Sequence, residues 1–503
     1  MTAATQQVAT RVVRNTVAQV AAMASTVVSK LLITILLGRL FGAERVGDYA
    51  AVMTFGLLFT FLASLGLHWT LIRETAVHVE DVHRYAGNGF SLVFMAGLLT
   101  IPLMVGAAAG LGYGRELLAA VALMGLALLF DCLAQLVGAV FNGLERMELG
   151  AAIIIVQEVT FLLAGVLVLW LRLPFLWLFV VYVPSRFVGL LLAFGLYRRL
   201  FGRGLRPEFD VPFIRSLLRT TAPFAANMAL GPIYLRVDVL LLSFYKGSLA
   251  VGLYEATAAI FYRFNILARM FNNALMPVMA REYETEVARI RSYVNAAARY
   301  QTLIGLPLTL FCLLLGERIV VLIYGPDFAE SGLVFSLMAS IILLRFLDNT
   351  LATTLTAVNM QTQRSIIVGL TAVFNIALNV YVLPLYSFQG AAVTTILTEL
   401  VFFAGLYLVL ARRVPQPLQW SGLVRPFLAA MAMGLAVWLL GDRPLLLHLI
   451  VSGAVYVGVL LALGGITREE WRFLWNLLHL DRLASLQLNK AAAGDAKSIP
   501  GGK

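Results

Sequence analysis

Charged side chains lie inside long apolar runs of this sequence. The stretch from Arg236 to Ala256 is an example: Arg236 and Asp238 precede a run of leucines, and Glu255 lies in the next apolar run. A charge at the centre of a membrane costs on the order of 2.5–3.5 kcal/mol on insertion scales. Such groups must therefore line water, pair with one another or bind an ionic ligand, and they are the best candidates for chemistry in this chain.

Similar charges recur in other apolar runs. The basic residues are Lys30, Arg186, Arg236, Arg263, Arg269 and Arg345, and the acidic residues are Asp131, Glu158, Asp238, Glu255, Asp348 and Glu399. At helical spacing, polar residues fall on common faces. These stripes include Asn15, Gln19 and Lys30; Asp131 and Gln135; Asn227, Tyr234 and Asp238; Glu255, Tyr262, Arg269 and Asn273; and Arg345, Asp348 and Asn349.

We expect these stripes to line a shared water-filled cavity. The alternative is that the charges form structural ion pairs between helices. Arg345 and Asp348, three residues apart, would then be one pair. We assign Arg186 to structure rather than to a binding site.

The composition identifies a membrane protein. Hydrophobic residues make up 60% of the chain and charged residues 13%, whereas soluble domains have roughly 25% charged residues. Apolar runs of about 20 residues, enough to cross a bilayer as a helix, recur along the chain. The predicted fold is an all-α polytopic membrane protein with about fourteen spans. We place them near 15–37, 47–68, 86–110, 116–142, 150–171, 174–197, 217–244, 249–276, 301–324, 331–357, 365–384, 389–411, 423–440 and 445–465.

The spans form two similar halves. Val46-Gly47-x-Tyr49 matches Val251-Gly252-x-Tyr254 in type and spacing. Both matches follow the first span of a half, so we expect two parallel six-helix bundles with a central site between them. The predicted organisation is a cytoplasmic N-terminus (1–14), two six-helix bundles (15–197 and 217–411) joined by a cytoplasmic linker (198–216), two further helices (423–465), and an amphipathic helix with a disordered tail (467–503).

The loop charges predict the orientation. Most loop arginines and lysines fall on the side that holds both termini, and cytoplasmic loops are the basic ones. We therefore expect both termini to be cytoplasmic and the protein to lie in the cytoplasmic (inner) membrane. The net charge of +11 is mainly this topology signal, and no nucleic-acid partner is expected.

Several classes of function are disfavoured. The two cysteines lie in apolar runs, and the sequence has no GxxxxGK[ST] phosphate loop. The predicted loops on the outer face are short, which leaves no room for a catalytic domain there. We expect no enzyme activity, no cofactor and no metal site.

The chain resembles the Wzx-type polysaccharide flippases, which belong to the superfamily of multidrug, oligosaccharidyl-lipid and polysaccharide exporters. The resemblance covers almost the whole chain. It rests on Gly38-Arg39-Leu40-Phe41-Gly42, on the two Val-Gly-x-Tyr matches, on Pro223 followed by Asp238, and on Asn273-Ala274-Leu275-Met276-Pro277-Val278-Met279-Ala280-Arg281. These motifs are loose and apolar, so they identify the family better than the substrate.

The resemblance implies a flippase that moves a polyprenyl-diphosphate-linked oligosaccharide, such as an undecaprenyl-diphosphate sugar, between leaflets. Its other implied partners are membrane lipid, a polysaccharide polymerase and chain-length proteins. We assign the diphosphate to Lys30, Arg263, Arg269 and Arg345, because cations suit phosphate. Cavity gating or ion coupling is assigned to Asp131, Asp238, Glu255 and Asp348. Candidates for sugar contact are Asn15, Gln19, Gln135, Asn227, Tyr234, Tyr262 and Asn273.

Three other functions remain open. A cation-coupled multidrug exporter of the same superfamily predicts a cavity dominated by acidic and aromatic residues, whereas bases are as numerous as acids in these spans. A membrane polymerase or ligase needs a large outer loop. A scaffold in a polysaccharide assembly complex has little need for polar stripes across the membrane.

Overall fold

The computed structural model describes residues 3–283 and 287–465, without the side chains of 3–13, 222–235, 273–274, 277, 287–288 and 420–421. The described part of the chain is helical. Its α-helices are α1 (Ala3–Ser64), α2 (Leu67–Val77), α3 (Val82–Gly110), α4 (Arg115–Gly143), α5 (Met147–Trp170), α6 (Leu176–Phe201), α7 (Val211–Tyr283), α8 (Val287–Tyr324), α9 (Ala329–Ala339), α10 (Ile342–Ala357), α11 (Gln361–Ala411), α12 (Val424–Leu440) and α13 (Leu445–Ala462). Short 3-10 helices cover Val79–Asp81, Pro326–Phe328 and Trp420–Leu423.

Nine helices in this described part are long and apolar enough to cross a membrane. Two shorter segments that meet at a bend, Pro326–Ala339 (which includes α9) and Ile342–Ala357 (α10), together form a tenth candidate. Four of the nine contain an internal break, at Gly42 in α1, Gly247 in α7, Leu315 in α8 and Ser387 in α11. The break at Leu315 lies inside the single predicted span 301–324. Dividing α1, α7 and α11 at their breaks, and adding the bent pair and the shorter α12, yields the fourteen predicted segments. The prediction of an all-α polytopic membrane protein is confirmed.

Some boundaries differ from those expected. The second predicted span does not end near residue 68, because α2 continues it after a break at Leu65 and Gly66, where φ is 52° and 73°. Leu67, Leu71 and Thr75 are buried at four-residue spacing, which keeps this charged segment helical against its neighbours. The linker is also shorter than expected, because α6 extends to Phe201 and α7 begins at Val211. The predicted amphipathic helix and tail (467–503) lie outside the described residues.

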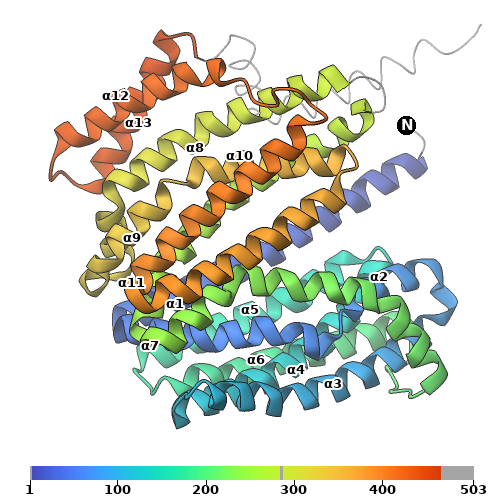
Figure 1. Cartoon of the computed structure of the whole chain (residues 1–503). Helices are drawn as coiled ribbons and strands as arrows, with labels where there is room; N and C mark the ends of the chain where they lie inside the picture. Colours follow the sequence, from blue (N-terminus) through green and yellow to red (C-terminus); the bar gives the residue numbers. More distant parts are fainter. Residues whose placement is uncertain (1–2, 284–286, 466–503) are drawn as a thin grey trace, which may run out of the picture.

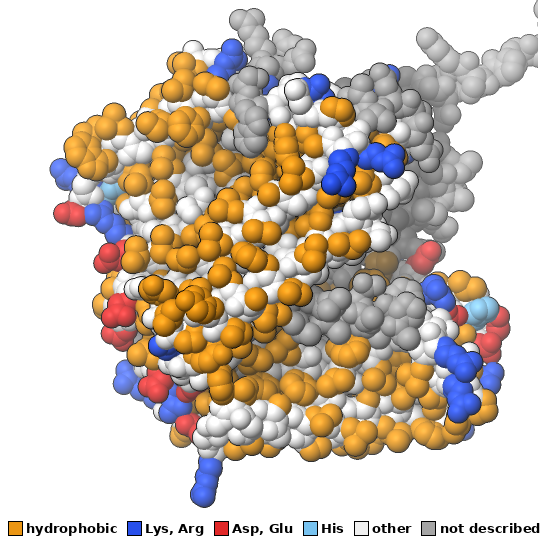
Figure 2. All heavy atoms as spheres, in the orientation of Figure 1, with side chains coloured by type: hydrophobic (Ala, Val, Ile, Leu, Met, Phe, Trp, Pro, Cys, Tyr) orange, Lys and Arg blue, Asp and Glu red, His pale blue; other side chains and the backbone are white. Residues whose placement is uncertain are grey.

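The helices form two groups. Figure 1 shows α2–α6 in the lower group and α8–α13 in the upper group, with α1 and α7 passing between them. On the face drawn in Figure 2, hydrophobic side chains cover most of the surface, while charged side chains gather mainly toward the helix ends. This distribution is typical of helices surrounded by hydrocarbon with their ends in water.

The two halves meet where α1 crosses α7. A Cβ atom added at Gly47 would overlap the carbonyl oxygen of Ser248, and one added at Gly252 would overlap that of Ala43. The contact is reciprocal, as an internal two-fold repeat requires. Gly42 and Gly247 also share one conformation, with φ 81° and ψ −178° against φ 77° and ψ −176°. Because side chains disfavour positive φ, both breaks need glycine.

The linker between the halves lies across the start of α3. Glu208 N donates to the carbonyl oxygen of Gly87 (3.2 Å), and Asp210 N donates to Oδ1 of Asn88 (2.7 Å). Nη2 of Arg84 lies 2.8 Å from Oδ2 of Asp210. The hydrogen bond from Arg84 lowers the pKa of Asp210 below its ordinary value. These contacts fix residues 202–210 to the first bundle.

We expect Gly47→Ala and Gly252→Ala each to lower the free energy of unfolding by about 1–3 kcal/mol, because the added methyl group must push two backbones apart. Thermal unfolding in detergent measures the change. Gly369→Ala is the matched control, since a Cβ atom there meets nothing within 4 Å. Equal melting temperatures for all three variants would contradict the crossing as described.

Asp210→Asn should loosen the linker, because it removes the charge that pairs with Arg84. We expect faster hydrogen–deuterium exchange in residues 202–210 at neutral pH, measured by mass spectrometry. The ion pair is present above the unfolded-state pKa of about 3.9 and is lost as the pH falls through the lower folded-state pKa. Asp442→Asn, which removes the exposed partner of Arg318 far from the linker, is the control. Unchanged exchange in the Asp210 variant would show that the backbone contacts alone hold the segment.

Candidate functional site

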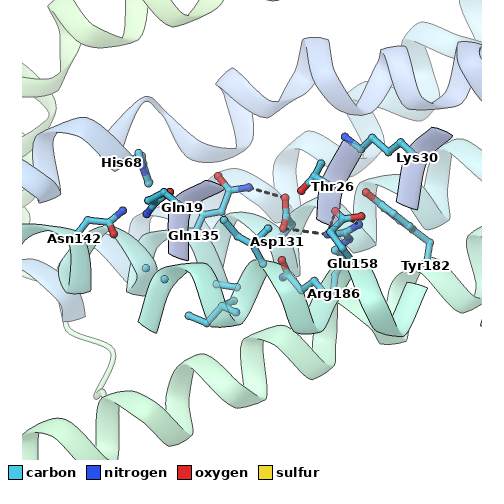
Figure 3. A pocket seen from close by; sticks show the side chains of 16 residues that line it. Gln19, Thr26, Lys30, His68, Asp131, Gln135, Asn142, Glu158, Tyr182 and Arg186 are labelled. Carbon is cyan, nitrogen blue, oxygen red and sulfur yellow. Dashed lines mark hydrogen bonds and ion pairs between the residues drawn. The ribbon is translucent and has the colours of Figure 1, made fainter. Parts of the chain in front are cut away.

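A polar cavity of about 340 Å³ lies in the first bundle. Figure 3 shows the side chains that surround it, which come from α1, α2, α4, α5 and α6. Its polar and charged lining residues are Gln19, Thr26, Lys30, His68, Asp131, Gln135, Asn142, Gln157, Glu158, Tyr182 and Arg186. A concave site with several convergent polar groups inside an apolar bundle is the default candidate for ligand binding.

A buried ion pair occupies one side of the cavity. Nη1 and Nη2 of Arg186 lie 3.1 and 3.0 Å from Oε1 of Glu158, and both side chains are only 4% exposed. The guanidinium also lies 4.0 Å from Asp131 and stacks over the Tyr182 ring at 4.3 Å. Asp131 in turn accepts a hydrogen bond from Gln135 at 2.7 Å. These contacts hold Arg186 and both carboxylates in place.

Lys30 is the other cation of this cavity. It lies on α1, set apart from the Arg186 cluster in Figure 3. Within the described residues, its ammonium has no hydrogen-bond or ion-pair partner, although Asp131 and Glu158 line the same cavity. A cation that faces a cavity without a partner is available to an anionic ligand.

Several buried polar atoms around the cavity also lack a partner within the described part of the chain. They are Oδ1 of Asn142, Nε2 of Gln157, Oε2 of Glu158 and Nε of Arg186. A buried polar group left without a hydrogen bond costs about 1–3 kcal/mol. Water or a polar ligand would relieve this cost, and the set contains both donors and acceptors.

The second bundle holds its own charges. Nη2 of Arg345 lies 3.0 Å from Oε2 of Glu399, and its guanidinium covers the Tyr262 ring at 4.8 Å. Asp348 is buried beside this pair, so the suggested pairing of Arg345 with Asp348 is replaced by one between helices. Elsewhere, Arg236 lies 2.6 Å from Glu255, and Asp238 accepts a hydrogen bond of 2.6 Å from Tyr254.

The two bundles use opposite charges at related places. In the first bundle the acid, Asp131, is on the fourth span and the base, Arg186, is on the sixth. In the second bundle the base, Arg345, is on the tenth span and the acid, Glu399, is on the twelfth. Each arginine stacks on an aromatic ring. The ionic contact between corresponding spans is thus reversed in polarity, although Arg186 binds Glu158 of the fifth span more closely, at 3.0 Å against 4.0 Å to Asp131.

The structure disperses the predicted diphosphate residues. Lys30 lines the first cavity, whereas Arg345 is held by Glu399 in the other bundle. Arg263 donates to the carbonyl oxygen of Ala259 in its own helix, and Arg269 is exposed on α7. Of the predicted gating residues, Asp131 lines the cavity, while Asp238, Glu255 and Asp348 lie in the second half.

The predicted sugar contacts are also divided. Gln19 and Gln135 line the cavity. Asn15 is buried and donates to the carbonyl oxygen of Glu145 at 2.9 Å, and Tyr262 lies under Arg345. The side chains of Asn227, Tyr234 and Asn273 lie outside the described residues.

His68, Glu158 and Arg186 all line the cavity but are not among the predicted site residues. The sequence does mark Glu158 and Arg186 as unusual, because they are charged residues within predicted membrane spans. Their helical phase could not show that they share a cavity with Lys30. His68 lies near the predicted end of the second span and had no such signal.

Arg186→Met should lower the free energy of unfolding by about 3–5 kcal/mol, because it leaves Glu158 as an uncompensated buried charge. Glu158→Met should be costly for the same reason. We expect the double variant to lose much less than the two single variants together, as measured by unfolding in detergent. Additive losses would show that the pair is not coupled.

Comparisons with known proteins agree with this architecture. The family model described as "Polysaccharide biosynthesis protein" matches residues 12–282. The "Probable flippase AglR" of Haloferax volcanii is 25% identical over 254 residues, which cover 47% of this chain and 52% of AglR. The chain thus spans about half the length of this curated relative.

Solved structures show the same fold. The lipid II flippase MurJ in an inward closed conformation matches with a TM-score of 0.73 and 14% identity, over 89% of this chain and 98% of MurJ. An inward-facing multidrug resistance MATE family transporter of the MOP superfamily matches with a TM-score of 0.60 and 12% identity, over 78% of this chain and 95% of the transporter. With the family model matching more than half of its residues, the chain belongs to the polysaccharide biosynthesis protein family and has the fold of the MOP superfamily transporters.

Proposed function

We propose that this protein is a flippase that moves a polyprenyl-diphosphate-linked oligosaccharide from the inner to the outer leaflet, for the synthesis of a surface polysaccharide. The observation that carries the proposal is Lys30, a cation that has no partner among the described residues and faces a polar cavity within an apolar bundle. A ligand that is anionic at one end and rich in hydroxyl groups matches such a cavity.

The relatives support the same reaction class. The family is named for polysaccharide biosynthesis, AglR is named a probable flippase, and MurJ is named a lipid II flippase. These proteins share sequence or fold with this chain. The polar and charged lining of the cavity in this chain suits the head group of a lipid-linked sugar. The polyprenyl tail would remain in the bilayer while the head group crosses.

The residues have complementary parts in this proposal. Lys30 attracts the diphosphate, because a charge interaction is stronger where water is scarce. Gln19, Gln135 and Asn142 offer hydrogen bonds to sugar hydroxyls. Arg263, Arg269 and Arg345 remain candidates for the diphosphate at other stages of transport, since the structure holds them outside the first cavity.

Alternating access would move the two bundles about the α1–α7 crossing. Near this crossing, the Tyr113 hydroxyl lies 2.7 Å from that of Ser243, and Arg39 donates to the carbonyl oxygens of Leu322 and Ile323. These contacts join the halves near the α1–α7 crossing, at the end that we assign to the outer face from the loop charges. We propose that they separate when the cavity opens outward.

The orientation and energy source form part of the proposal. Both termini are placed in the cytoplasm and the protein in the inner membrane. An inside-negative potential favours the outward movement of an anion by about 2.3 kcal/mol per charge per 100 mV. Asp131, Asp238, Glu255 and Asp348 are the candidates for gating or for a coupling cation.

A cation-coupled multidrug exporter is the second candidate. Two carboxylates, Asp131 and Glu158, line the cavity, and the fold matches a MATE family transporter. This candidate requires the carboxylates to take part in cation binding, whereas Arg186 already contacts both of them.

Lys30→Ala should abolish most flipping of a fluorescent undecaprenyl-diphosphate glycan in proteoliposomes, whereas Lys30→Arg should retain part of it. Lys246→Ala is the matched control, because Lys246 is an exposed lysine outside the cavity. An unchanged flipping rate in Lys30→Ala would contradict the assignment of Lys30 to the diphosphate site. Absence of flipping in the wild type, with ion-driven efflux of cationic dyes, would favour the exporter.

A further inference from the structure

An apolar groove of about 430 Å³ lies beside the linker, away from the transport cavity. Its walls are Phe90, Ser91, Phe94 and Met95 of α3, with Pro207 and Phe209 of the linker. Phe94 is 41% exposed and Phe209 is 58% exposed. Large aromatic side chains are thus exposed at a place that the described part of the chain leaves uncovered.

The groove continues into the lipid-facing surface of α3. Leu98, Leu99 and Leu103 follow Phe94 and Met95 along the helix and are 46–66% exposed. The groove residues begin about 12 Å along the helix axis from its start at Val82, at a rise of 1.5 Å per residue. A hydrocarbon chain could therefore run from the bilayer into the groove without leaving an apolar surface.

Four exposed arginines lie in the chain just before the linker residues that line the groove, and Arg206 directly precedes Pro207. They are Arg198 and Arg199 at the end of α6, and Arg203 and Arg206 in the linker. Within the described residues, none of the four has an ion-pair or hydrogen-bond partner. The nearby acids are engaged elsewhere, because Asp210 pairs with Arg84 and Glu208 accepts a hydrogen bond from Asn88.

From this arrangement, we infer a binding site for an anionic phospholipid of the cytoplasmic leaflet. Its phosphate lies among Arg203, Arg206 and the neighbouring arginines, and one acyl chain lies along Phe90, Phe94 and Phe209. Guanidinium groups suit phosphate oxygens, and a basic segment at the membrane surface attracts anionic lipid. The charge complementarity and the continuous apolar path select a lipid rather than a protein segment.

The linker geometry supports a built site. Hydrogen bonds to Gly87 and Asn88 fix the backbone of residues 208 and 210, so Pro207 and Phe209 keep their position against α3. A Cβ atom at Gly87 would press on the carbonyl oxygen of Arg206, which shows how closely the linker approaches the helix. A lipid bound in this groove would contact both α3 and the linker at the membrane surface.

The inference rests on the cytoplasmic placement of the linker but not on the transported substrate. The test uses the full chain in detergent, with native mass spectrometry and titration by phosphatidylglycerol or phosphatidylcholine. We expect a preference for phosphatidylglycerol in the wild type. Arg203→Gln/Arg206→Gln should weaken it by at least about tenfold, since a charged hydrogen bond contributes roughly 1.5–3 kcal/mol. Phe209→Ser should also weaken binding while leaving the arginines in place.

Arg412→Gln/Arg413→Gln is the matched control, because these two arginines are equally exposed but lie after α11, away from the groove. An equal loss in this control would mean nonspecific surface attraction and would overturn the site. Equal binding of both lipids would overturn the role of the phosphate. Displacement by glycerol phosphate alone would show that the acyl chain is not bound. A separate assay measures flipping by the Arg203→Gln/Arg206→Gln variant. The lipid-binding result thus stands or fails independently of the proposed flippase activity.

Discussion

The close crossing of α1 and α7 is the constraint on which the rest of the structure depends. At Gly47 and Gly252 the two backbones touch without intervening side chains, and each glycine meets the carbonyl of the other helix. Close approach of small residues is a general way to join membrane helices, because hydrocarbon provides no hydrophobic force between them. This junction joins the two bundles closely, and it positions α1, which carries Lys30 into the cavity of the first bundle.

The buried charges follow a second constraint, which is that a low-dielectric interior does not tolerate unpaired ions. Arg186 and Arg345 each bind a carboxylate from another helix and stack on an aromatic ring. The inverted polarity of the two sites leaves the total number of charges nearly balanced while making the two inner surfaces different. A pair of similar bundles can thus present unlike environments to one ligand.

Lys30 differs from Arg186 and Arg345, because no described carboxylate pairs with it. The two basic and two acidic residues of the cavity balance in formal charge, so attraction for an anion depends on the position of Lys30 rather than on the net charge. Arg186 contacts both carboxylates, whereas the Lys30 ammonium has no hydrogen-bond or ion-pair partner within the described residues. The linker groove has a similar combination at the molecular surface, where Arg203 and Arg206, which have no partner within residues 3–283 and 287–465, lie close in the chain to its apolar walls.

The sequence by itself determined the membrane class, the helical spans, the two-fold repeat and the set of charges that need explanation. Hydrophobic length and two local motifs are sufficient for these conclusions, because they depend on neighbours along one helix. Only the tertiary structure decided which charges meet: Arg345 pairs with Glu399 rather than Asp348, and Lys30 shares a cavity with Glu158 and Arg186. Helical phase gives the face of each residue but not the partner helix, since that depends on how distant segments pack.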